Sequence, residues 1–251
     1  MTGPEVMEKH KKVVVAGLGE VGKPLLELVS KHYDTIAVDI APIQRIGPAD
    51  VLHVCYPFQI KDFVGETARY VELFSPKLVI INSTVAVGTT RAVAERTGIS
   101  VAYSPVRGKH ARMLQDLQRY TKFIGALDKV CAEKAAAHFA SLGLNTRILS
   151  SPEAAETAKL TETTFFGLMI AWAQEVERYA DQFGGSYDEI VSFYEEIGFF
   201  PPVKYFPGVI GGHCVMPNIE LLKRFTDSAI LDAIEHSNRK KTERDTRTGR
   251  K

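Results

Sequence analysis

The chain has 251 residues, of which 45% are hydrophobic and 24% charged, with a formal net charge of +1. This composition excludes a collagen-like or mostly disordered protein, and the length predicts one or two domains. No apolar run reaches the roughly 18 residues that a membrane helix needs, and no signal peptide is visible, so we expect a cytoplasmic protein. Three widely spaced cysteines, Cys55, Cys131 and Cys214, suggest neither a disulfide framework nor a metal site.

The first 150 residues alternate apolar strand patterns with helical patterns. Strands are predicted at 13–16, 35–39, 51–55, 78–81, 101–103 and 122–126. Such alternation predicts an α/β fold with a parallel sheet and helices on both faces. Residues 40–50 are too few for a full crossover helix, so we expect an abbreviated connection there.

A long helical pattern begins at Ser151-Pro152-Glu153, which combines a cap, a proline and an early acid. No stop signal follows until Gly184-Gly185, about 32 residues later. At roughly 1.5 Å per residue this helix would be about 48 Å long, so we expect it to bridge domains or subunits. Two further helices are predicted at 187–197 and 218–237.

These patterns predict a sheet domain at 1–150 and an all-helical domain at 151–237. Residues 238–251 contain seven Lys or Arg and two Asp or Glu. We expect them to form a disordered basic tail rather than a nucleic-acid site, because the rest of the chain is acidic.

A glycine-rich turn, Gly17-Leu18-Gly19-Glu20-Val21-Gly22, follows the first predicted strand. Gly17 would allow a tight turn, Gly19 the close approach of a pyrophosphate, and Gly22 the packing of helix on strand. Asp39, at the end of the second strand, would bind ribose hydroxyls and repel a 2′-phosphate, which favours NAD over NADP. The motif therefore predicts a Rossmann-type, NAD-binding domain.

Polar residues follow the carboxyl ends of the later strands, which face the ligand crevice in parallel sheets. Their hydroxyls can contact ribose, nicotinamide or substrate, or serve only the turns in which they lie. We assign Tyr56, Pro57 and Ser83 to the cofactor, Thr84 to catalysis and Ser104 to the substrate.

Two other places could carry chemistry. Lys159 and Thr163 lie one helical turn apart, and the lysine could stabilise an oxyanion or move a proton. The string Gly211-Gly212-His213-Cys214 lets the backbone approach a ligand and presents a thiol. Each has an ordinary alternative, namely a solvated lysine and an inert, packed cysteine.

Together, these motifs resemble the UDP-glucose/GDP-mannose dehydrogenase family, in the same order. The segments that carry the resemblance are GLGEVGKPL, NSTVAVGTT, SPVR, the helix EAAETAKLTETTFFGLMIAWAQEVERYA, and PGVIGGHCVMP. The resemblance implies oxidation of an alcohol through an aldehyde to an acid, with two NAD and a thioester on Cys214. It also implies a homodimer through the long helix and a small-molecule substrate bound by residues that include Gly211, Gly212, His213 and Asn218.

The chain departs from the family pattern at three positions. Val106 replaces the glutamate of SPER, Thr163 an asparagine, and Asn218 an aspartate. The sequence also stops before the second α/β domain of usual members, so we expect a shortened member with a substrate other than a usual UDP- or GDP-sugar. Two alternatives stay open: a single-step dehydrogenase similar to the 3-hydroxyacid dehydrogenases, and an inactive NAD-binding protein.

Overall fold

The computed structural model describes residues 11–39, 47–108, 110–198, 205–211 and 214–248. The chain divides into two compact units, residues 1–159 and 160–251, so the division lies nine residues beyond the expected boundary. Most of the connection expected at 40–50 lies outside the described residues. No helix in the described part of the chain is long and apolar enough to cross a membrane.

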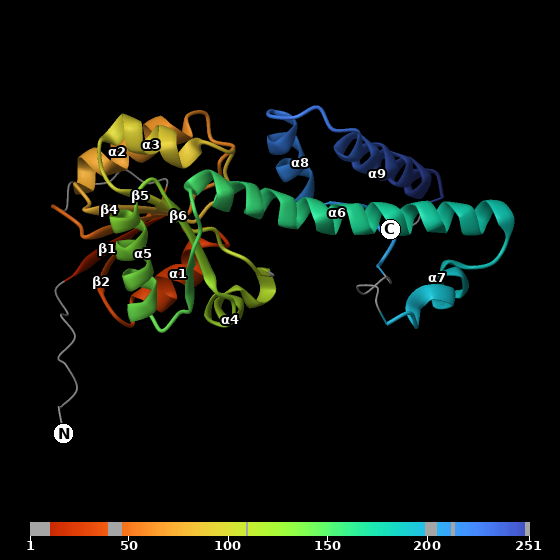
Figure 1. Ribbon diagram of the computed structural model, residues 1–251, viewed down its shortest axis with the longest axis horizontal. Coiled ribbons are helices and arrows are strands. Elements are labelled where there is room, and N and C mark those ends of the chain that lie inside the picture. Colours follow the sequence, from red (N-terminus) through yellow and green to blue (C-terminus); the bar gives the residue numbers. More distant parts are fainter. Residues whose placement is uncertain (1–10, 40–46, 109, 199–204, 212–213, 249–251) are drawn as a thin grey trace, which may run out of the picture. The chain divides into compact units, whose positions relative to one another are not determined.

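A seven-stranded sheet in the order β2-β1-β3-β4-β5-β6-β7 forms the centre of the first unit (Figure 1). Its strands are β1 (Lys12–Ala16), β2 (Asp34–Val38), β3 (Val51–Val54), β4 (Leu78–Ile81), β5 (Val101–Tyr103), β6 (Lys122–Ala126) and β7 (Thr146–Ile148). The six predicted strands are therefore confirmed to within a residue at each end. β3 and β4 are buried throughout, as the continuous apolar runs of central parallel strands require.

The sheet is mostly parallel, as predicted, but the last two strands differ from the prediction. β6 runs antiparallel to β5, and β7 pairs with β6 in parallel. The sequence did not predict β7, because this edge strand has only three residues and two of them are exposed.

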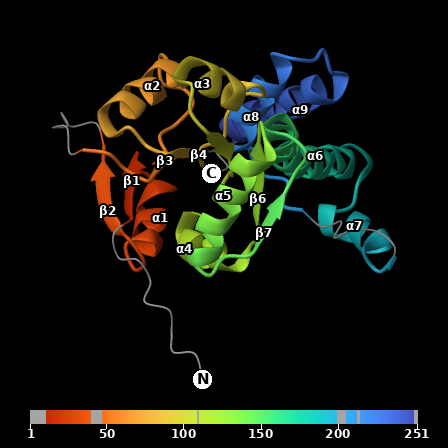
Figure 2. The same cartoon turned by 60° about the vertical axis from the view of Figure 1, so that its left-hand side comes forward.

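Helices cover both faces of the sheet (Figure 2). α1 (Gly22–Val29), α4 (Met113–Arg119) and α5 (Lys129–Ser141) pack on one face, with a 3-10 turn (His110–Arg112) before α4. α2 (Phe63–Phe74) and α3 (Thr89–Thr97) pack on the other face. Each face therefore has its own apolar core, and the carboxyl ends of β1 to β5 lie along one edge between them.

The second unit is helical in its described part. The long predicted helix is confirmed as α6 (Pro152–Phe183), whose first turns belong to the first unit, and α7 (Tyr187–Glu195) follows it. The single helix predicted at 218–237 is instead two helices, α8 (Val215–Lys223) and α9 (Ala229–Thr248). The break falls where Thr226, Asp227 and Ser228 offer side chains that compete with helical backbone hydrogen bonds.

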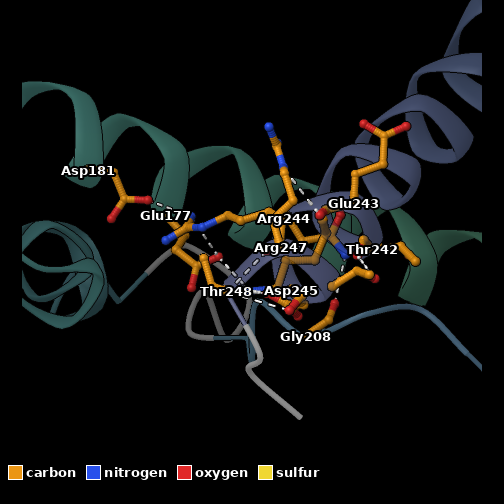
Figure 3. A network of polar contacts seen from close by, with 12 residues as sticks. Glu177, Asp181, Gly208, Thr242, Glu243, Arg244, Asp245, Arg247 and Thr248 are labelled. Atoms are coloured by element: carbon orange, nitrogen blue, oxygen red, sulfur yellow. Dashed lines mark hydrogen bonds and ion pairs between the residues drawn. The ribbon is translucent and has the colours of Figure 1, made fainter.

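α9 continues through most of the segment that was expected to be a disordered tail. That prediction is wrong for residues 238–248, because their basic side chains find acidic partners on α6 (Figure 3). Lys241 Nζ lies 2.8 Å from Glu177, and Arg244 pairs with both Glu177 and Asp181. Three residues, 249–251, lie beyond the described part of the chain.

Candidate functional site

The glycine-rich turn between β1 and α1 has the geometry that its sequence predicts. Gly17 has a φ of +90°, and a Cβ there would lie 2.5 Å from the backbone nitrogen of Tyr56. A Cβ on Gly22 would overlap the carbonyl oxygen of Gly17, whereas a Cβ on Gly19 would meet nothing within 4 Å. Two glycines are thus needed by the fold, and the third leaves open space for a ligand.

The start of α1 can receive an anion at this open space. Val21 is the N-cap residue and makes no side-chain capping bond; in the first turn Lys23 N donates to Gly19 O at 3.1 Å, and Pro24 has no N–H. Leu18 is half-buried and packs against the apolar core on this face of the sheet, whereas Glu20 is exposed. The turn therefore fits the pyrophosphate of a dinucleotide.

A cavity of about 510 Å³ adjoins the turn. Its lining includes Gly17, the exposed Asp39 and Tyr56, which the sequence had assigned to one cofactor site. Pro57 is exposed and next to Tyr56. The structure therefore brings the predicted ribose-binding acid and the glycine turn to one hollow.

Two basic residues that the sequence did not single out, Lys61 and Arg69, line the same cavity. Arg69 donates two hydrogen bonds to Glu66, at 2.9 and 2.5 Å, and lies 4.5 Å from the ring centroid of Tyr70. The guanidinium holds the pKa of Glu66 below its usual range. Neither residue lies near a recognised sequence motif, so their place at the cavity is visible only in the folded structure.

The hydroxyl residues after β4 and β5 meet at the carboxyl edge of the sheet. Ser83 Oγ donates to the carbonyl oxygen of Tyr56 at 2.6 Å, which ties two predicted cofactor residues together. Thr84 is half-buried. Ser104 is fully buried, and its Oγ has no hydrogen-bond partner within the described structure.

Lys122 is a buried residue at this edge that sequence reasoning missed. Its Nζ donates to the carbonyl oxygens of Ser104 and Pro105, at 2.8 and 3.1 Å. Burial lowers the pKa of Lys122 to about 7, with further lowering by the charges of Arg107 and Lys159. The only sequence signal was a lysine at the start of an apolar strand.

In the second unit, Cys214 is exposed and occupies the N-cap position of α8. One turn later, Asn218 Nδ2 donates to Thr163 Oγ1 on α6 at 2.6 Å, and Thr163 Oγ1 in turn donates to Leu160 O at 3.0 Å. Two positions that depart from the family pattern are therefore hydrogen-bonded to each other. Lys159 is half-buried on α6, one turn before Thr163 as predicted.

α8 packs closely on α6 because a glycine lies at the contact. A Cβ on Gly167 would lie 2.5 Å from Val215 Cγ1, immediately after Cys214. Gly211 is exposed, while Gly212 and His213 lie outside the described residues. The predicted substrate loop is therefore described only at its two ends.

Two buried amide side chains hold the segment that leads to Cys214. Gln174 Nε2 donates to Gly208 O at 2.7 Å. Asn238 accepts from Ile210 N at 2.7 Å and donates to Ile210 O at 2.9 Å. Asn238 had been placed in a tail, and its role depends on contacts across 28 residues that no local pattern reveals.

No group of three or more His, Cys, Asp or Glu side chains is arranged for a metal ion among the residues that the structure describes.

Residues 153–240 match the central domain of the UDP-glucose/GDP-mannose dehydrogenase family. A UDP-N-acetyl-D-mannosamine dehydrogenase of Pyrococcus horikoshii is 33% identical over 272 residues, covering 84% of this chain and 63% of the relative. The chain is therefore similar to this family over most of its length. It spans 61–63% of the length of curated relatives such as this one and a UDP-N-acetyl-D-mannosamine dehydrogenase of Methanococcus maripaludis, which is 26% identical over 83% of this chain.

Solved structures show the same fold. A UDP-D-ManNAc dehydrogenase of Pyrococcus horikoshii aligns with a TM-score of 0.77 at 22% identity, over 91% of this chain and 68% of the other. A 3-hydroxyisobutyrate dehydrogenase of Mycobacterium tuberculosis aligns with a TM-score of 0.69 at 16% identity, over 94% of both chains. At these identities the likeness is one of fold alone.

Proposed function

We propose that this chain is an NAD-dependent dehydrogenase that oxidises an alcohol group of a small molecule. The observation that carries the proposal is the glycine turn, with open space at Gly19, beside a cavity lined by Asp39. A glycine-lined hollow of this kind, with an exposed acid at its rim, suits an adenine dinucleotide. The named relatives, all dehydrogenases, support the same class of reaction.

The side chains then have the following roles in the proposal. The glycine turn and the positive end of the α1 dipole bind the pyrophosphate, and Asp39 accepts from the ribose hydroxyls. NAD would supply the hydride acceptor. Lys159 stabilises the developing oxyanion and Thr84 orients the reacting group, while Cys214 is the nucleophile for a second oxidation step.

The substrate-side residues favour an alcohol other than that of a usual UDP- or GDP-sugar. Val106 cannot serve as a base, and the Thr163–Asn218 pair is neutral. General-base help is worth roughly 10²–10⁴ in rate, so release of an acid would be slow here. This favours, as a second candidate, a single-step dehydrogenase of the 3-hydroxyacid type, in which Cys214 is dispensable.

Calorimetric titration with NAD and NADP tests the proposal. We expect tighter binding of NAD, and Asp39→Ala should narrow the difference because the 2′-phosphate is no longer repelled. Gly19→Ala should weaken NAD binding without lowering the melting temperature, since its Cβ meets no neighbour in the protein. Equal or tighter binding of NADP by the unmodified protein would contradict the proposal.

A substrate panel separates the candidates. UDP-N-acetyl-D-mannosamine, the substrate in the relatives' names, belongs in it beside short 3-hydroxyacids. NADH formation that is unchanged in Cys214→Ser favours the single-step reaction. Tight NAD binding without turnover of any alcohol or aldehyde would support the inactive NAD-binding alternative instead.

A further inference from the structure

A row of three buried polar side chains crosses the interior of the first unit and ends two residues before Thr84 in the sequence. His53 lies on β3, Asn82 follows β4, and His138 lies on α5; they are 0%, 1% and 8% exposed. Asn82 Nδ2 is 3.1 Å from His53 Nδ1, and His53 Nε2 is 2.9 Å from His138 Nε2. Buried polar groups without a role are rare, because each one costs free energy to remove from water.

The hydrogen bonds of this row can run in only one direction. The carbonyl oxygen of Ile80 only accepts, so the amide atom 3.0 Å from it must be the donor Nδ2 of Asn82. The same nitrogen faces His53 Nδ1, which must therefore accept, and a neutral His53 carries its proton on Nε2. That proton is donated to His138 Nε2, so His138 carries its own proton on Nδ1.

The row ends on a residue that joins three segments at the cofactor edge of the sheet. The backbone nitrogen of Asn82 donates to Val54 O at 2.8 Å, and its carbonyl oxygen accepts from Val106 N at 3.3 Å. The next residue, Ser83, donates to Tyr56 O. Movement of Asn82 would therefore disturb the turns after β3, β4 and β5 together.

The surroundings keep both imidazoles neutral. Burial lowers the pKa of His53 well below its usual value, and electrostatic interactions with His138 and Lys122 lower it further. Burial also lowers the pKa of His138 to about 4, aided by Lys11. Tyr33 stacks on His138 with ring centroids 5.3 Å apart, and Phe139 packs on both imidazoles; no carboxylate acts on either imidazole in the part of the chain that the structure describes.

We propose that His53 and His138 are positioning residues that fix the amide of Asn82, and through it the loops that receive the nicotinamide end of the cofactor. The inference rests on the proposed function for its cofactor, but the direction of the hydrogen bonds stands without it. The proposal requires a single arrangement of protons in the row. It also predicts that removal of the last acceptor, His138 Nε2, weakens binding of the cofactor at these loops.

NMR of the protein labelled with ¹⁵N-histidine tests the arrangement directly. At neutral pH we expect a neutral His53 with its proton on Nε2 and a neutral His138 with its proton on Nδ1. His53→Gln and His138→Gln spectra assign the two signals. A proton on Nδ1 of His53, or an imidazolium at either position, would overturn the inference.

Binding of NADH, followed by its fluorescence, tests the effect on the cofactor loops. In His138→Gln the side-chain oxygen can replace the lost acceptor, so we expect affinity within about two-fold of the original. In His138→Leu the His53 donor has no partner, and we expect affinity about five-fold or more weaker, the scale of one hydrogen bond. Circular dichroism confirms that both variants are folded at the assay temperature.

The outcomes separate the two claims. If His138→Leu binds NADH as tightly as the original protein, or if His138→Gln loses as much affinity as His138→Leu, the row has no positioning role. If the original protein binds no NADH, the proposed function fails, and the NMR tautomers alone decide whether the row is ordered as we infer. If His138→Leu does not fold, the tautomers and the NADH affinity of His138→Gln decide whether the row has a positioning role.

Discussion

The three cysteines differ in the surroundings that govern whether a thiol reacts. Cys55 and Cys131 are buried, and burial raises the pKa of their thiols to about 12 and about 11. Cys214 is exposed at the N-cap position of α8. The thiolate is the reacting form, so the two buried thiols should react slowly, whereas the Cys214 thiol is accessible to reagents.

Iodoacetamide should therefore modify Cys214 first. Under mildly alkaline conditions we expect its alkylation to be about ten-fold or more faster than that of the other two cysteines, because they are protonated and shielded. Peptide mass spectrometry over a time course measures the three rates. Cys214→Ser is the control and should leave the folded protein almost unlabelled; rapid labelling of Cys55 would contradict the prediction.

At the residue scale, sequence reasoning succeeded where a requirement is local. The glycines of the turn at 17–22 are dictated by backbone angles and close contacts within the turn and its neighbouring strand, and a motif records them. Sequence reasoning did not identify Lys122 and Asn238, because their hydrogen-bond partners lie 17 to 64 residues away in the chain. No spacing rule connects such residues until the fold brings them together.

At the element scale, the start of α3 depends on a side chain from α6. The N-cap residue, Gly88, has no side chain to bond the free N–H groups. The carboxylate of Glu156, which is fully buried, accepts from Gly88 N at 2.7 Å, Thr90 N at 2.9 Å and Thr90 Oγ1 at 2.6 Å. Burial raises the pKa of Glu156, because removing the carboxylate from water costs free energy. The three hydrogen bonds offset part of this cost.

Glu156→Ala should lower the free energy of unfolding by about 2–3 kcal/mol, because it leaves buried donors without an acceptor. Urea denaturation followed by circular dichroism measures the change. Glu153→Ala is a matched control three residues away, since Glu153 pairs with the half-exposed Arg91 and should cost less than about 1 kcal/mol. Equal losses in the two variants would show that the cap does not stabilise α3.

Elements that have one continuous apolar pattern were predictable from the sequence. The break between α8 and α9 and the pairing of β6 and β7 were not. The apolar runs of β1, β3 and β4 and the uninterrupted pattern of α6 each carry their own signal. The antiparallel direction of β6 is defined by its pairing with β5, which the apolar pattern of the strand alone does not encode.

At the scale of the whole molecule, buried Lys122 makes stability depend on pH. Its pKa of about 7 in the folded state lies below the usual 10.5. Between these values the unfolded chain holds a proton on Lys122 that the folded protein lacks. The free energy of unfolding therefore rises with pH from about 7 upward, by at most about 1.4 kcal/mol per pH unit for one proton.

Urea midpoints at pH 7, 8 and 9 test this dependence. We expect the slope of stability against pH to be more positive for the original protein than for Lys122→Met, because the variant has no proton to lose at that site. The window ends near pH 9, since the raised pKa of Cys55 acts in the opposite sense above it. Parallel slopes for the two proteins would contradict a neutral buried lysine.

A stripe of exposed apolar side chains on α6 supports a homodimer. Phe165, Trp172 and Phe183 are 55%, 51% and 76% exposed, and Leu168 and Tyr179 lie on the same face at helical spacing. We infer from this row of exposed aromatic side chains that α6 provides a protein–protein contact surface.

Sedimentation velocity should show a dimer at micromolar concentration. Trp172→Glu should shift the protein towards monomer, because a charge would have to be buried at the contact. Val130→Glu, at an exposed apolar residue of α5 outside the stripe, is the control and should leave the dimer intact. A monomeric original protein would refute the proposal.

The strand order of the sheet has a consequence for how the protein is made. From β4 onward each strand pairs with the strand that precedes it in the chain, and only β3 must pass β2 to reach β1. During synthesis, each strand from β4 onward would therefore leave the ribosome after the strand with which it pairs. Each new edge is covered soon after it forms, which limits the time that unpaired strand edges spend exposed to other nascent chains.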